Sequence, residues 1–166
     1  MIENTGFVYG QAHTLHPSCV TQADVDDFHH ISKGGVSVTL EGLQRVMTSC
    51  RIAVVRRSLI GKTGRIVATA SLAHLDLLSG NAGIITNFFF APIKDGEELL
   101  RLRAALIECL VNEADSMAKR HLAIVAHVME GAAGEMYRES GFGEVVEGKL
   151  LIRQRPRLAS VAASSA

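Results

Sequence analysis

The sequence predicts an α+β fold in which helices cover both faces of a mixed sheet. Apolar runs typical of strands and apolar spacings of three and four residues typical of helices follow in the order β, α, α, β, β, β, α, β, α, β-β. In the centre of the chain, an apolar run over residues 84–90 leads into a long helical pattern, and another covers residues 121–128. Two strands joined by a crossover helix are expected to lie parallel, so the sheet combines parallel and antiparallel pairs.

The first part of the chain predicts one strand and two short helices. Weak alternation of apolar and polar residues over 7–15 is consistent with a strand. Thr21 or Asp24 can open a helix, and a pair of glycines is expected to end it after about residue 32. A second helix is expected over residues 39–49.

Residues 51–57 and 65–74 predict two strands joined by a glycine-rich connection, which is typical of an antiparallel hairpin. The connection contains Gly-Lys-Thr at 61–63, which resembles the end of a phosphate-binding Walker A loop. That motif also needs a glycine at the position held by Arg56, and no helical pattern follows. A hairpin turn is therefore the better interpretation.

A long amphipathic helix is predicted after the central strand. Its apolar stripe recurs every three or four residues and comprises Leu99, Leu102, Leu106, Leu110, Ala114 and Met117. Asp95 is expected to be the N-cap, with Glu98 as its capping-box partner. Unpaired backbone N–H groups at such a helix start can bind an anion, unless the acids of the helix occupy those groups themselves. Both interpretations stay open.

Composition favours one globular domain over residues 1–153, followed by an Ala/Ser-rich tail over 154–166 that is expected to be disordered. The 17 basic and 17 acidic residues balance, so neither nucleic acid nor an anionic membrane is expected as a partner. No apolar run reaches the roughly 18–20 residues of a membrane span, and no secretory signal is recognised at the start. Three widely separated cysteines argue against a disulfide framework, which favours the cytoplasm.

The C-terminal part predicts a helix over residues 132–140, ended by Gly141, with Phe142 packing back on its last turn. Two short strands are expected within 143–153. Tyr137, three further residues and the Gly-Phe pair resemble the signature of the GNAT superfamily of acyl-CoA-dependent N-acyltransferases, and Ala133 matches the small residue usually found four positions earlier.

The resemblance to the GNAT superfamily covers nearly the whole chain. The strand over residues 84–90, ending in Ala91-Pro92, resembles the family's central strand, whose backbone pairs with the pantetheine arm. The family implies a partly splayed sheet of six to seven strands. The sheet is then expected to open between residues 84–90 and 121–128, leaving a cleft bounded by Tyr137.

The resemblance also implies site residues. Tyr137 matches the position that is often the general acid, and backbone N–H groups near residues 89–91 would stabilise an oxyanion if the family's strand bulge is present. His127, near the end of its strand, suits a general base near neutral pH, and His74 with Asp76 is a second option. The residues expected to bind acetyl-CoA or another acyl-CoA are Phe89, Phe90, Ala91, Lys94, Gly96, Ala133 and Tyr137.

Two positions depart from the family pattern. In the pyrophosphate loop only Gly96 matches, because Asp95 stands where a basic or amide residue is expected and Glu98 where a glycine is expected. Glu130 stands where the family often has Asn. The acids at the helix start would repel phosphates and could occupy the N–H groups that phosphates need.

The resemblance therefore implies an N-acyltransferase, most simply an acetyltransferase, that moves an acyl group from a CoA-type thioester to a small-molecule or protein amine. The alternative is a non-catalytic GNAT-fold binding or regulatory protein that has lost acyl-CoA binding. No metal site is expected, because the His13–His16 and His29–His30 pairs lack supporting ligands. The acceptor stays open, and so does the oligomeric state, with a homodimer as one option.

Overall fold

The computed structural model describes residues 7–34, 38–59, 64–75, 82–119, 121–125, 131–146 and 150–154. Within these residues, four α-helices are present: α1 (Gln22–Ile31), α2 (Leu40–Val46), α3 (Gly96–Ser116) and α4 (Gly131–Glu139), with a 3₁₀ turn, η1, at Pro17–Cys19. The strands are β1 (Phe7–Tyr9), β2 (His13–Thr14), β3 (Cys50–Leu59), β4 (Arg65–Leu75), β5 (Ala82–Phe90), β6 (His121–Val125), β7 (Gly143–Val146) and β8 (Leu150–Gln154).

The described strands form one mixed sheet of eight strands in the order β1-β3-β4-β5-β6-β8-β7, with β2 paired to β3 beside this path. Six to seven strands were expected, and the difference arises because the segment predicted as a first strand is two short strands, β1 and β2. The parallel pair is β5 with β6, as predicted, and the other described pairs are antiparallel. The hairpin of β3 and β4 is also confirmed, although its tip at 61–63 lies outside the described residues.

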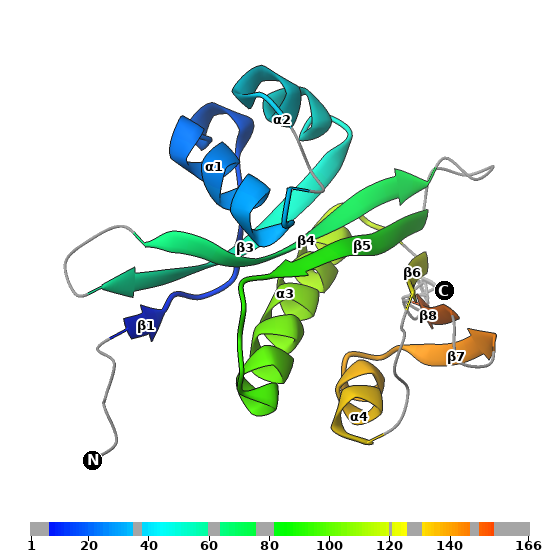
Figure 1. Ribbon diagram of the computed structural model, residues 1–166. Helices are drawn as coiled ribbons and strands as arrows, with labels where there is room; N and C mark the ends of the chain where they lie inside the picture. The colour runs from blue at the N-terminus through cyan, green and yellow to red at the C-terminus, as the bar shows by residue number, and fades with distance from the viewer. Residues whose placement is uncertain are drawn as a thin grey trace, which may run out of the picture.

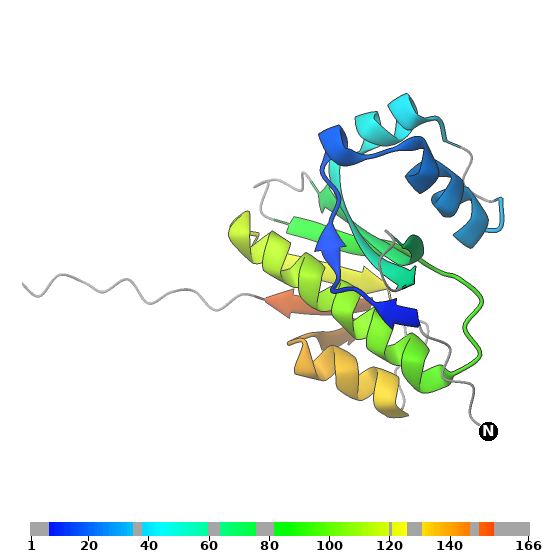
Figure 2. The same cartoon turned by 90° about the vertical axis from the view of Figure 1, so that its left-hand side faces the viewer.

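Helices cover both faces of this sheet (Figures 1 and 2). On one face, α3 and α4 pack on a core that includes Leu106, Leu110, Ile85 and Tyr137. On the other face, α1 and α2 pack on a second core, which includes Phe28, and η1 contacts α2. The sheet thus separates two apolar layers, each supplied by alternate residues of the same strands.

Local sequence signals explain where the helices begin and end. Thr21 is the N-cap of α1 and forms a capping box with Asp24. Gly141, at φ 82°, ends α4: its N–H donates to the Arg138 carbonyl and the Phe142 N–H donates to the Tyr137 carbonyl, which is a Schellman ending. The predicted C′ glycine and its packed phenylalanine are therefore confirmed, and Phe142 is buried.

The long helix follows its predicted apolar stripe only in part. The buried residues of α3 are Leu102, Leu106, Ile107, Leu110 and Ala114. The start at Asp95 is confirmed, and α2 ends earlier than expected, at Val46. Within the described residues, no helix combines the length and apolar character needed to cross a bilayer. The tail over 154–166 was expected to be disordered; only Gln154 of it is described, as the last residue of β8.

Candidate functional site

The central strand β5 continues past the described part of β6. The register between them joins Ala82–Ile85 to His121–Ile124, and β5 then runs on to Phe90 while the described part of β6 ends at Val125 (Figure 1). The backbone of residues 86–90 therefore has no register partner among the described residues of β6. Such a backbone can pair with an extended ligand that carries amide groups.

A β-bulge lies in this same stretch. Thr69 of β4 pairs with Phe89 and Ser71 pairs with Thr86, so one residue of β4 faces two residues of β5, Asn87 and Phe88. Asn87 has φ 55°, a left-handed conformation that Asn tolerates better than most residues, and its amide donates to the Ser71 Oγ at 3.0 Å. The run of residues 84–90 predicted a regular strand; the signal for the bulge was the single Asn inside it.

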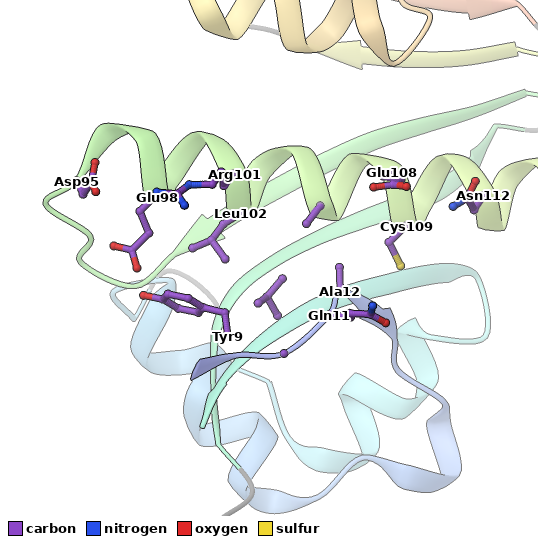
Figure 3. A pocket seen from close by; sticks show the side chains of 13 residues that line it. Tyr9, Gln11, Ala12, Asp95, Glu98, Arg101, Leu102, Glu108, Cys109 and Asn112 are labelled. Carbon is purple, nitrogen blue, oxygen red and sulfur yellow. The ribbon is translucent and has the colours of Figure 1, made fainter. Parts of the chain in front are cut away.

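The helix that follows begins with a carboxylate bound to its own backbone. The Asp95 Oδ1 accepts a hydrogen bond from the Glu97 N–H at 2.9 Å, so the predicted N-cap is confirmed. The predicted capping box is not formed by Glu98: its side chain points toward Tyr9 and interacts with that hydroxyl (Figure 3). A Cβ at Gly96 would meet nothing within 4 Å, and Lys94 is exposed, so the space over this helix start is open.

Tyr137 lies in the contact between α4 and α3. It is 1% exposed, and its hydroxyl accepts a hydrogen bond from the Arg103 Nη1 at 3.0 Å. The Arg103 guanidinium also lies 5.3 Å from the ring centre of Phe88 and 5.4 Å from that of Phe90. Arg103 therefore links the Tyr137 hydroxyl to the part of β5 that extends beyond the described residues of β6.

The predicted ligand-binding residues divide between the two faces of the sheet. Phe90 packs against the core under α3 and Phe89 on the opposite core, next to the first helices, whereas Ala91 packs against both cores. Ala133 is half-buried in the first turn of α4. The Ala91 N–H was expected among the oxyanion donors; it instead donates to the Val67 carbonyl at 2.7 Å, which corrects that expectation.

Of the expected bases, only His74 can be described. It lies near the end of β4 and is half-buried. His127, Asp76 and Glu130 lie outside the described residues. Metal chemistry has no described site either, since the described part of the chain brings together no group of three or more His, Cys, Asp or Glu side chains that could hold an ion.

A cavity of about 730 Å³ lies between the N-terminal strand region and α3 (Figure 3). Its lining includes Tyr9, Glu98, Arg101 and Cys109, but not Tyr137. Burial, followed by the hydrogen bond and charge of Glu98, raises the pKa of Tyr9. Cys109 is half-buried, packs against the core and borders this cavity. No local sequence pattern predicts this cavity, because it depends on two segments that are distant in the chain.

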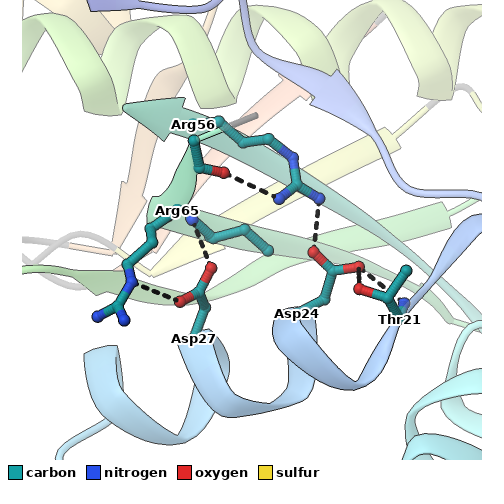
Figure 4. Close-up of polar contacts among 7 residues, drawn as sticks. Thr21, Asp24, Asp27, Arg56 and Arg65 are labelled. Atoms are coloured by element: carbon teal, nitrogen blue, oxygen red, sulfur yellow. Dashed lines mark hydrogen bonds and ion pairs between the residues drawn. The ribbon is translucent and has the colours of Figure 1, made fainter. Parts of the chain in front are cut away.

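A second cavity of about 400 Å³ lies where α1 meets the hairpin of β3 and β4. Most of its charged residues bond to neighbouring groups: Arg56 bonds to Asp24 at 2.6 Å, and Asp27 accepts a hydrogen bond from the Ile66 N–H at 2.8 Å (Figure 4). Arg65 lies 4.0 Å from Asp27. These contacts tie α1 to the hairpin, so we interpret this region as structural.

Comparison with solved structures places this arrangement in a known fold. A probable acetyltransferase of Staphylococcus epidermidis matches with TM-score 0.62 and 15% identity over 90% of this chain and 100% of its own. A GNAT-family acetyltransferase of Streptococcus pneumoniae matches with TM-score 0.60 and 13% identity over 90% and 99%. N-acetylglutamate synthase of Neisseria gonorrhoeae, solved with coenzyme A and N-acetyl-glutamate, matches with TM-score 0.53 and 16% identity over 91% of this chain and 35% of its own.

These likenesses define the class by its fold: the chain has the GNAT fold. By sequence alone, no family model and no curated protein matches. The expected resemblance is thus confirmed at the level of the fold.

Proposed function

We propose that this protein is an N-acyltransferase that moves an acyl group, most simply acetyl, from a CoA-type thioester to an amine. The observation that carries this proposal is the stretch of β5 at residues 86–90, which extends past the described part of β6 and leads to the start of α3. In a GNAT fold this backbone can pair with the amides of a pantetheine arm. The thioester would then lie beside the bulge at Asn87 and Phe88.

The chain's residues fit the pantetheine arm better than the phosphates. Phe89, Phe90 and Ala91 would flank the arm, with Ala133 and Tyr137 on the α4 side. Gly96 leaves open space for a phosphate, and Lys94 can supply a positive charge. Against this, Asp95 holds the Glu97 N–H, and Glu97 and Glu98 add negative charge in the first turn. We therefore expect weak acyl-CoA binding.

In the proposed reaction, a neutral amine attacks the thioester carbonyl, a C–N bond forms and the C–S bond breaks. Tyr137 would protonate the leaving thiolate, and His127 would remove the proton that the amine loses. Because Tyr137 is 1% exposed, this role requires neighbouring side chains to move when the thioester binds. Backbone N–H groups at the bulge replace Ala91 as the proposed oxyanion donors.

A second candidate function is a non-catalytic GNAT-fold binding protein. The observation that favours it is the Asp95 cap, since the carboxylate occupies a backbone N–H that a pyrophosphate would otherwise use. A free amine would then bind without acyl transfer. We place either activity in the cytoplasm, since the three cysteines are free. A homodimer is part of the proposal and can be tested by light scattering.

Ligand-induced stabilisation distinguishes the two candidates. Acetyl-CoA at 100 to 1,000 times its Kd should stabilise a true binder by about 3–4 kcal/mol and raise its Tm by several degrees. ADP serves as a control for binding through the nucleotide alone. Release of free CoA thiol in the presence of polyamines, amino acids or peptides then tests transfer. Absence of both the Tm shift and thiol release would refute the acyltransferase and leave the binding protein.

A further inference from the structure

Arg103 makes three contacts that meet at one point between β5, α3 and α4. Its Nη1 donates to the Tyr137 hydroxyl, and its guanidinium lies over the rings of Phe88 and Phe90. The two rings are nearly parallel, with an interplanar angle of 8° and centres 6.4 Å apart. A planar cation on two stacked rings has few alternative positions, so the rings fix where the guanidinium meets Tyr137.

The direction of the hydrogen bond matters for the chemistry. A guanidinium only donates, so the Tyr137 oxygen must accept and its own proton stays available for transfer. When that proton leaves, the resulting phenolate would face a fixed positive charge at 3.0 Å. Preorganised charge of this kind stabilises a transition state because it needs no rearrangement as charge develops.

We propose that Arg103 is a positioning residue that orients the Tyr137 hydroxyl and stabilises its charge while it acts as the general acid. The amine nitrogen bonds to the acyl carbon, the C–S electron pair moves to sulfur, and the Tyr137 proton moves to sulfur. The proton lost by the amine passes to His127, and exchange through solvent then returns a proton to Tyr137, while Arg103 stays protonated throughout. This role rests on the proposed acyl transfer, and it names a residue outside the recognised motif.

The kinetic test is a double-mutant cycle. We expect Arg103→Gln to lower kcat about 10- to 100-fold with little change in the KM for acetyl-CoA, because one fixed donor to a developing charge is removed. Arg103→Lys, which keeps the charge but loses the planar geometry, should retain part of the rate. In a Tyr137→Phe background, Arg103→Gln should have no further effect. A raised KM, or full additivity in the double mutant, would overturn the positioning role.

A second measurement tests the contact between Arg103 and Tyr137 and does not depend on enzyme activity. The chain has two tyrosines, so labelling the ring carbon that bears the hydroxyl gives two carbon-13 signals, which Tyr9→Phe assigns. Arg103→Gln should shift the Tyr137 signal. Arg138→Gln is the control and should not shift it, because Arg138 follows Tyr137 in α4 but its side chain is exposed. An unmoved signal would overturn the contact. No transfer by the wild-type protein would instead overturn the proposed function, and the catalytic role of Arg103 with it, even if the signal shifts.

Discussion

The Asp24 carboxylate lies 2.6 Å from the Arg56 guanidinium, and this ion pair joins α1 to the strand β3. The side chain of Asp24 is only 4% exposed and that of Arg56 is 21% exposed, so removal of one partner leaves a charge largely shielded from water. The same carboxylate also accepts the Thr21 N–H at 2.8 Å. One side chain therefore both caps α1 and holds it on the sheet.

We expect Arg56→Met to lower the free energy of unfolding by about 2–4 kcal/mol, because Asp24 would keep its charge without its partner. The exposed pair Arg45–Glu41 offers a matched control, with both side chains more than three-quarters exposed. Arg45→Met should change stability by less than about 0.5 kcal/mol. Urea unfolding measures both, and equal effects of the two substitutions would contradict the structural role of the Asp24 pair.

The same carboxylate predicts a loss of stability in acid. Burial is the largest influence on Asp24 and opposes ionisation, but the hydrogen bonds from Thr21 and Arg56 outweigh it, so its pKa is below the usual 3.8. A lowered folded-state pKa stabilises the protein above 3.8, and that stabilisation is lost as pH falls from there through the folded-state pKa. The melting temperatures of the wild-type protein and of Asp24→Asn should therefore converge as the pH is lowered from 5 toward 2. A constant difference between the two melting temperatures would contradict this.

Two glycines should respond oppositely to a methyl group. A Cβ at Gly83 would lie 2.8 Å from the Leu72 Cδ1 and 3.2 Å from the Leu122 Cδ2. We expect Gly83→Ala to destabilise the protein by about 1–3 kcal/mol, as overpacking does. Gly96→Ala meets open space, so its Tm should stay within about one degree or rise slightly. Acetyl-CoA affinity should nevertheless fall in Gly96→Ala if a phosphate lies over this helix start.

Asp95→Asn separates helix capping from electrostatic repulsion. Asn caps as well as Asp does, so the Tm should not change, whereas Asp95→Ala should cost about 1 kcal/mol. Asp95→Asn removes one negative charge from the helix start where phosphates would bind. A charge near a helix end changes the interaction free energy by about 0.3–1 kcal/mol, so acetyl-CoA binding should tighten about two- to fivefold. Calorimetric titration measures this. Weaker binding by Asp95→Asn would mean that the phosphates do not lie at this helix start.

Sequence patterns located most elements because the signals for them are local. Each helix cap satisfies backbone groups within a few residues, so the caps can be predicted directly from the sequence. The examples are Thr21 with Asp24, then Asp95, and then Gly141 with Phe142. The interruption between β1 and β2 was missed because a weak alternation does not reveal where pairing with β3 breaks. The family resemblance raised a bulge in this strand only as a condition, and its place at Asn87 could not be predicted because it depends on how β4 and β5 align.

The sequence by itself determined the order of the elements, the parallel pair and the caps, because hydrophobic periodicity and turn chemistry act over short distances. Only the tertiary structure decided the partners of the charged side chains. Glu98 was expected to cap its own helix but turns to Tyr9, and Arg103 meets Tyr137 across 34 residues of sequence. Long side chains select partners from whatever the packed sheet brings near them, and that proximity exists only after the helices have docked on its two faces.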